Sequence, residues 1–180
     1  GNKKIKKRYF EMNSNVITLI ISFFIIVLAQ VFLFNNMFIF GFINPMIYLL
    51  FLVVYRFDDN QTLFILLSFI LGFCIDFLSQ SGGAHTIASL TIGFVRPLLI
   101  KYSFGVTSEA PSTFQNDLRR RNKYFFLALL ILIHHLLYFI IVYFNWNAAY
   151  LILKNTILTS LFSLILIALI SRFYKKLNET

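Results

Sequence analysis

Long apolar stretches alternate with short polar breaks along the whole chain. An α-helix rises about 1.5 Å per residue, so roughly 20 apolar residues are needed to cross a ~30 Å hydrocarbon core. Most of the stretches reach that length, and the pattern predicts an all-α integral membrane protein, a bundle of six transmembrane helices. The expected spans are residues 16–34, 44–55, 62–79, 84–102, 124–144 and 149–173.

The second of these spans is unusually short. It opens at Pro45, which suits the first turn of a helix because its missing N–H has no helical partner there. From Pro45 to Tyr55 there are 11 residues, too few to cross a membrane unaided. Two alternatives stay open. Either residues 38–43 enter the membrane as irregular or helical backbone, or the short helix is shielded from lipid by its neighbours.

Composition agrees with a membrane protein. Of 180 residues, 59% are hydrophobic and only 13% are charged, whereas a soluble domain is about 25% charged. The apolar run 16–34 is long for a signal peptide and no small-residue cleavage site follows it, so we expect it to be the first span. The single Cys74 excludes an internal disulfide.

The positive charges are distributed very unevenly. The connections 35–44, 79–84 and 145–150 contain no Lys or Arg. The other side of the expected bundle carries 14 of the 16 basic residues, all except Arg96 and Lys154: Lys3, Lys4, Lys6, Lys7, Arg8, Arg56, Lys101, Arg119, Arg120, Arg121, Lys123, Arg172, Lys175 and Lys176. Such a split predicts that both termini are cytoplasmic.

The net charge of +9 is therefore a topology signal, aided by anionic lipid at the inner face, and not a nucleic-acid footprint. The whole chain, 1–180, is expected to be one transmembrane domain. It has a basic cytoplasmic segment at 1–15 and a cytoplasmic loop at 103–123, which is either a solvated loop or a docking strip for a cytoplasmic partner.

Asp76 and Arg96 are the two acidic or basic residues inside apolar runs on which a site could be built. They could form a binding site or proton path, or they could be polar contacts that hold the bundle together. Asp76 lies near the outer end of its span and Arg96 in the inner half of the next, so a direct ion pair between them is not expected. Asp76 could instead accept hydrogen bonds from residues 82–86, and Arg96 could reach toward the inner interface.

The histidines and the catalytic motifs give little support for an enzyme. His85 is expected at the outer end of a span, in capping or packing, while His134 and His135 point about 100° apart on a helix and cannot easily share a metal. Asp76 is the only carboxylate in a span, and no G-x-S-x-G, H-E-x-x-H or phosphate-loop motif is present. The sequence predicts a non-enzymatic protein without cofactor or metal.

Small residues gather on the third and fourth spans, where they permit close approach of helix backbones. This stripe holds either a partner helix or the tightest internal packing, and it comprises Ser68, Gly72, Ala84, Ala88, Ser89 and Gly93. Gly82 and Gly83 form the turn between the spans, and Pro97 interrupts the fourth. The structural or partner-binding candidates are Gly72, Asp76, Gly82, Gly83, Gly93, Arg96 and Pro97.

Several of these motifs resemble the bacterial rod shape-determining MreD family. Leu28-Ala29-Gln30 ends the first span before a polar turn, and Asn44-Pro45-Met46 opens the second. The strongest match is Leu71-Gly72-Phe73-Cys74-Ile75-Asp76-Phe77-Leu78-Ser79 followed by Gly82-Gly83, which is similar to the family's G-x-x-x-D pattern and Ser/Gly turn. The basic end 172–176 also fits, and the resemblance covers the whole length.

The resemblance implies a membrane subunit of the bacterial cell-elongation machinery, located in the cytoplasmic membrane. Such a protein binds and stabilises MreC, a single-span protein, and works with MreB, RodA and a penicillin-binding transpeptidase in peptidoglycan synthesis. The implied fold is similar to the S-component of energy-coupling-factor vitamin transporters. The alternative function is a small-molecule-binding S-component, which should show an external pocket with several fixed polar donors.

Overall fold

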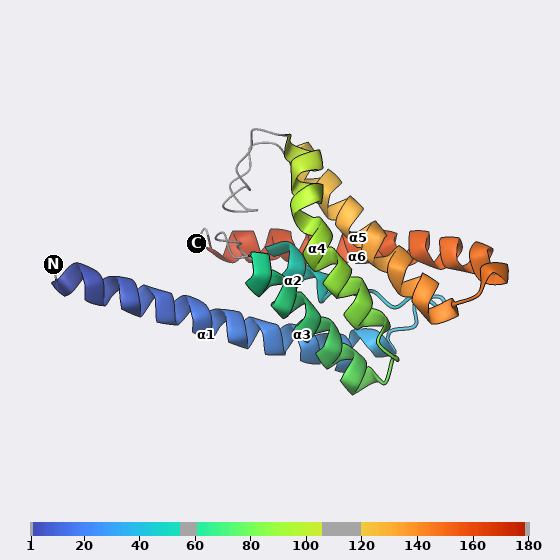
Figure 1. Cartoon of the computed structure of the whole chain (residues 1–180), viewed down its shortest axis with the longest axis horizontal. Coiled ribbons are helices and arrows are strands. Elements are labelled where there is room, and N and C mark those ends of the chain that lie inside the picture. The colour runs from blue at the N-terminus through green and yellow to red at the C-terminus, as the bar shows by residue number, and fades with distance from the viewer. Residues whose placement is uncertain (1, 55–60, 106–119, 179–180) are drawn as a thin grey trace.

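The described part of the chain forms five long helices and one very short one in the computed structural model (Figure 1). The structure describes residues 2–54, 61–105 and 120–178, with side chains described at 17–53, 61–105 and 122–171. The helices are α1 (Asn2–Phe32), α2 (Leu49–Val54), α3 (Gln61–Ser79), α4 (Ala84–Phe104), α5 (Arg120–Tyr143) and α6 (Ala149–Asn178), with single 3-10 turns at Phe34–Asn36 and Trp146–Ala148.

The number of spanning helices differs from the expectation. Five segments in the described part of the chain are long and apolar enough to cross a membrane: Ile17–Asn36, Gln61–Ser79, Ala84–Phe104, Asn122–Tyr143 and Trp146–Ser171. The described residues thus contain five helices of spanning length where the sequence predicted six, and the difference lies at the expected second span. There, the stretch that begins at Pro45 forms irregular backbone followed by the six-residue helix α2.

This second stretch lies inside the bundle, and we call residues 43–54 the inner segment. Tyr48, Leu49 and Leu52 have no exposed surface at all. Before the inner segment, the chain makes a tight turn in which Ile39 and Ile43 exchange backbone hydrogen bonds of 3.0 Å. Phe40 in that turn is exposed. The short helix is therefore shielded by its neighbours, which is one of the two alternatives left open by the sequence.

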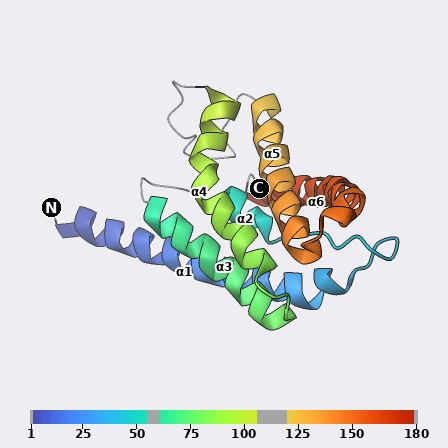
Figure 2. The ribbon, with the colours of Figure 1, turned by 45° about the vertical axis from the view of Figure 1, so that its right-hand side comes forward.

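The described helix ends fall into two groups (Figures 1 and 2). The start of α1, the start of α3 and the end of α6 point toward one side of the bundle. The turns from α3 to α4 and from α5 to α6 lie at the opposite end. By position in the sequence, nine of the 14 expected basic residues flank the first group, and the other five flank the end of α4 and the start of α5, which lie at the top of Figure 1.

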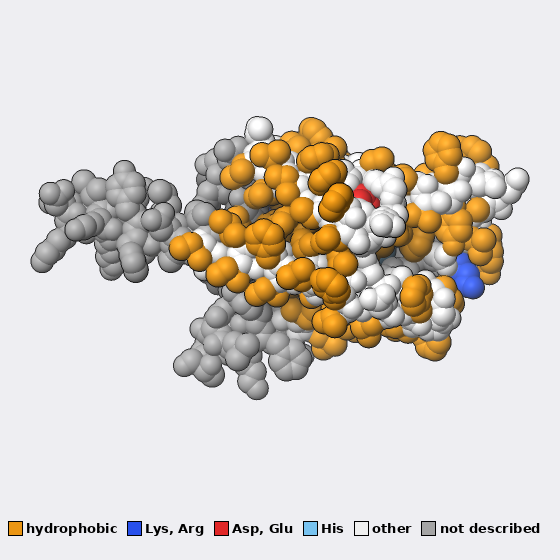
Figure 3. Space-filling view, turned by 90° about the horizontal axis from the view of Figure 1, so that it is seen from below, with side chains coloured by type: hydrophobic (Ala, Val, Ile, Leu, Met, Phe, Trp, Pro, Cys, Tyr) orange, Lys and Arg blue, Asp and Glu red, His pale blue; other side chains and the backbone are white. Residues whose placement is uncertain are grey.

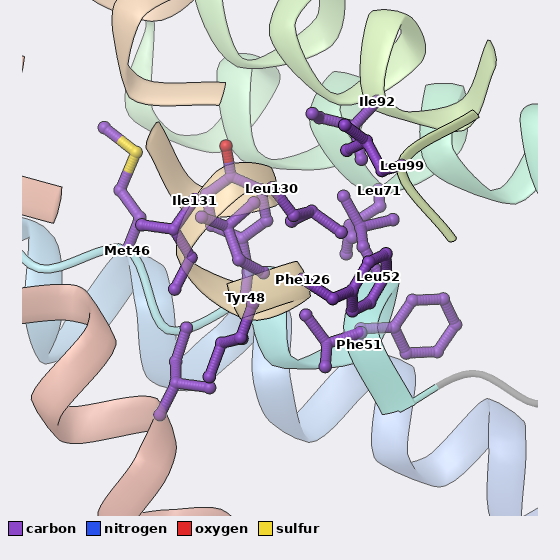
Figure 4. Packing of buried hydrophobic residues seen from close by; sticks show 14 of the residues in the cluster. Met46, Tyr48, Phe51, Leu52, Leu71, Ile92, Leu99, Phe126, Leu130 and Ile131 are labelled. Atoms are coloured by element: carbon purple, nitrogen blue, oxygen red, sulfur yellow. The ribbon is translucent and has the colours of Figure 1, made fainter. Parts of the chain in front are cut away.

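Helices that are neighbours in sequence also pack as neighbours, since α3 packs on α4, α4 on α5 and α5 on α6, while α1 lies against α3. The hydrophobic core forms where these helices surround the inner segment. Figure 4 shows Tyr48 and Leu52 among side chains from α5 such as Phe126, Leu130 and Ile131. Because lipid is as apolar as these side chains, burying them from lipid gives little hydrophobic stabilisation. In a membrane the core is therefore stabilised by close van der Waals packing.

Candidate functional site

Asp76 joins the end of α3 to the beginning of α4. One carboxylate oxygen accepts from the Ser81 hydroxyl at 2.5 Å and from the His85 backbone N–H at 3.1 Å. The other accepts from the backbone N–H and the hydroxyl of Thr86 at 2.7 and 2.5 Å. The first N–H groups of a helix have no intrahelical acceptor, so a carboxylate at this position satisfies them. The negative charge also interacts favourably with the positive end of the helix dipole.

Glycines allow this arrangement. A Cβ atom on Gly72 would lie 2.5 Å from the His85 carbonyl oxygen and 2.6 Å from Thr86 Cα, so the backbones of α3 and α4 touch at this point. In the turn between the two helices, Gly82 and Gly83 have φ of +70° and +91°, backbone conformations that residues other than glycine rarely adopt. The motif that carries the family resemblance therefore forms one compact unit. In it, Gly72 permits the close approach of α3 and α4, and Asp76 caps the beginning of α4.

Gly93 and Arg96 lie farther along α4, away from this unit. A Cβ on Gly93 would meet the Ser68 side chain at 3.1 Å. The Arg96 guanidinium is 4.6 Å from the centre of the Phe64 ring on α3, and Arg96 is 8% exposed. Within the described residues, Asp76 and Arg96 do not pair with each other, as expected from their different depths.

Pro97 follows directly and lies on an exposed part of α4, inside the helix. At both Gly72 and Gly93 an added Cβ atom would meet the neighbouring helix, so the small residues of α3 and α4 serve internal packing.

A second polar cluster lies deeper, around the Tyr48 hydroxyl of the inner segment. This hydroxyl is 2.9 Å from Nδ1 of His85 on α4 and 2.7 Å from Nε2 of His134 on α5. A hydroxyl has one proton, so Tyr48 can donate to one imidazole only while it accepts an N–H from the other. The two histidines must therefore hold complementary tautomers. His85 also packs its ring against Tyr138, with ring centres 4.5 Å apart.

His135 holds the inner segment through α6. Its Nδ1 lies 2.7 Å from the Ile131 carbonyl oxygen, so Nδ1 carries the proton and donates. Its Nε2 is then free to accept from the Ser163 hydroxyl at 3.2 Å. The Ser163 oxygen in turn accepts the backbone N–H of Met46 at 3.0 Å. One imidazole with one proton satisfies every member of this chain.

Gln30 holds the inner segment from the opposite side, from α1. Its side-chain oxygen accepts the backbone N–H groups of Ile47 and Tyr48 at 2.8 and 3.3 Å, and its amide donates to the Pro45 carbonyl at 3.2 Å. The same amide donates to Asn35 at 2.8 Å. In lipid, irregular backbone is stable only where protein groups satisfy it, and Gln30 and Ser163 provide that satisfaction here.

The chemistry available to these clusters is hydrogen bonding that fixes positions. Among the described residues, no group of three or more His, Cys, Asp or Glu side chains is placed to hold a metal ion. Each histidine nitrogen that contacts another group contacts a hydroxyl or a carbonyl: His85 and His134 contact Tyr48, and His135 contacts Ser163 and Ile131. The clusters hold together α1, α4, α5, α6 and the inner segment.

Sequence reasoning found part of this arrangement. It anticipated that Asp76 would accept from residues 82–86 and that His134 and His135 would point in different directions. It missed Tyr48 and the hydrogen bond by which Ser163 holds the inner segment. The available signal was Gln30, a polar residue inside an apolar span, whose side chain is wholly buried.

No family model, curated protein or solved structure was found to match this chain.

Proposed function

We propose that this chain is a non-enzymatic membrane subunit of the bacterial cell-elongation machinery, of the MreD type. It resides in the bacterial cytoplasmic membrane with both termini in the cytoplasm. It binds and stabilises a single-span protein resembling MreC, and through it acts with MreB, RodA and a penicillin-binding transpeptidase in peptidoglycan synthesis.

The observation that carries this proposal is the unit formed by the motif on which the resemblance rests. Gly72, Asp76 and the Gly82-Gly83 turn are not scattered in space, because together they build the junction of α3 and α4. Each motif residue has its own role in that junction: Gly72 permits the close approach of α4, the glycine pair supplies the positive φ of the turn, and Asp76 accepts from the first N–H groups of α4. These distinct roles support the resemblance.

The outer surface of the bundle supports a partner that is itself a membrane helix. Figure 3, seen from below the view of Figure 1, shows hydrophobic side chains over most of the coloured surface. On α3, Phe69, Phe73 and Phe77 form a row of stacked rings, and all three are exposed. Since α3 uses its small residues to pack on α4, this row is the face of the third span that is left for another helix or for lipid.

The second candidate function is the S-component of an energy-coupling-factor transporter, whose fold the MreD family is expected to share. The polar residues at the ends of the expected outer turns belong to the clusters already described, since Asn35 donates to Ser79 at 2.6 Å and accepts from Gln30. Asn145 accepts the backbone N–H of Asn147 within its own turn. These side chains are used within the protein, which favours the scaffold function over vitamin binding.

The test is affinity purification of the tagged full-length chain in mild detergent, with mass spectrometry of what is recovered. We expect a single-span protein of the MreC type together with elongation proteins. A variant in which Phe73 and Phe77 are both replaced by alanine should recover less of it, whereas the matched pair Ile157→Ala and Leu161→Ala on α6 should not. Recovery of a pair of transporter ATPases in place of elongation proteins would overturn the proposal in favour of the S-component.

A further inference from the structure

The helices of this protein form two groups that meet at the inner segment. On one side α1 packs on α3, and on the other α5 packs on α6, while α4 lies between α3 and α5. The inner segment lies among both groups, with Phe51 against Phe23 of α1 at 5.4 Å between ring centres. Figure 4 shows the opposite flank of the segment packed on Phe126 and Leu130 of α5.

Hydrogen bonds from both groups end on the same few residues. Gln30 of α1 binds the backbone of Pro45, Ile47 and Tyr48. Ser163 of α6 binds the backbone N–H of Met46, between them. Adjacent residues of one irregular stretch are thus held from opposite sides of the bundle.

The Tyr48 side chain extends the same pattern to the middle of the bundle. Its hydroxyl contacts His85 on α4 and His134 on α5. The inner segment is therefore bonded to four helices, although it is itself helical only over Leu49–Val54.

We propose that the inner segment is the element that fixes the spacing of the α1–α3 group relative to the α5–α6 group. A spanning helix satisfies its own backbone, so its neighbours can shift along it without breaking hydrogen bonds. Helices cannot shift in this way along the irregular stretch at Pro45–Tyr48, because its backbone N–H groups depend on Gln30 and Ser163. Such a shift would leave these groups unsatisfied, which is disfavoured in lipid. Loss of one holding side chain should therefore let the two groups separate, whatever the protein's partner is.

The experiment measures distances between spin labels in the full-length protein in nanodiscs, in a Cys74→Ser background. One pair of labels replaces the exposed Leu28 on α1 and Leu161 on α6, and reports the spacing of the two groups. A reference pair replaces the exposed Phe73 on α3 and Phe94 on α4, and reports the packing of these two helices. Each pair is measured with and without Ser163→Ala.

Ser160→Ala is the matched control. Ser160 is also buried on α6, three residues from Ser163, but its hydroxyl has no hydrogen-bond partner among the described residues. We expect Ser163→Ala to move the α1–α6 distance to longer values and to broaden it, with the α3–α4 distance unchanged. Ser160→Ala should change neither distance.

Gln30 provides an independent arm from the other side of the segment. Gln30→Leu removes all the bonds that this side chain makes to the inner segment, and should give a larger change in the α1–α6 distance than Ser163→Ala. Gln30→Glu keeps an acceptor for Ile47 and Tyr48 and, of the bonds to the inner segment, loses only the one donated to Pro45, so it should change the distance less than Gln30→Leu. The proposal is overturned if Ser163→Ala leaves the α1–α6 distance unaffected, or if both label pairs broaden alike.

Discussion

The Asp76 carboxylate accepts from Thr86 twice, from the backbone N–H at 2.7 Å and from the hydroxyl at 2.5 Å. Asp76 belongs to the last turn of α3, and Thr86 to the first turn of α4. The pair therefore ties together two antiparallel helices at the point where the chain reverses. This carboxylate is one of the charges that the sequence places inside an apolar run, and the structure uses it as a helix cap.

Replacement of Asp76 should reduce stability in proportion to the acceptors that are lost. Asp76→Asn keeps one oxygen, but its amide group faces donors, so we expect a loss of about 1 kcal/mol, as for a typical cap. Asp76→Leu leaves all the donors unpaired and should reduce stability by about 3 kcal/mol. Unfolding of the purified protein by titration with SDS measures both. Equal stability of the leucine variant and the wild type would contradict the capping role.

Gly72 should be the least replaceable glycine in the described helices. A Cβ there meets backbone atoms of α4 at 2.5 and 2.6 Å, so the helices must move apart, and we expect a loss of roughly 2–3 kcal/mol for Gly72→Ala. The matched variant is Gly93→Ala, where the nearest atom belongs to the Ser68 side chain at 3.1 Å. The same SDS titration should show a clearly smaller loss for Gly93→Ala, and the reverse order would contradict the predicted contact.

Tyr48→Phe should destabilise the fold without changing its shape. The substitution removes the hydroxyl between His85 and His134 and leaves two buried ring nitrogens unpaired, with an expected loss of about 1–3 kcal/mol. Tyr138→Phe is the control, because Tyr138 contacts His85 through its ring. Thermal unfolding in detergent should give a lower midpoint for Tyr48→Phe than for Tyr138→Phe. Equal midpoints would mean that the hydroxyl contributes nothing.

The charge distribution predicts the orientation in the membrane. In a Cys74→Ser background, a cysteine at Asn147 should react with an impermeant maleimide added to intact cells. A cysteine at Gln115, in the expected cytoplasmic loop and outside the described residues, should react only after lysis. Labelling of Gln115→Cys but not Asn147→Cys in intact cells would reverse the assignment.

How far the sequence predicts this structure depends on the range of the interactions. The long helices follow from apolar length alone, and the Asp76 cap follows from a short turn that brings α4 back to the end of α3. The close α3–α4 packing was visible as a stripe of small residues. Each of these features is set by neighbouring elements.

The inner segment could not be predicted in the same way. Its fit depends on Ser163, which is 117 residues from the Met46 N–H that it accepts. A hydropathy pattern contains no information on which distant hydroxyl will satisfy an irregular backbone. For the same reason, the pattern predicted a sixth spanning helix where the chain has a short helix within the bundle.

The inner segment also sets the parity of the chain. Five spanning helices are an odd number of crossings, which by themselves would leave the two ends on opposite faces of a membrane. Because residues 37–54 lead the chain back from the end of α1 toward the start of α3 (Figure 1), the start of α1 and the end of α6 face the same side. A topology inferred by counting hydrophobic helices alone would therefore place these two ends on opposite faces, although they lie at the same end of the molecule.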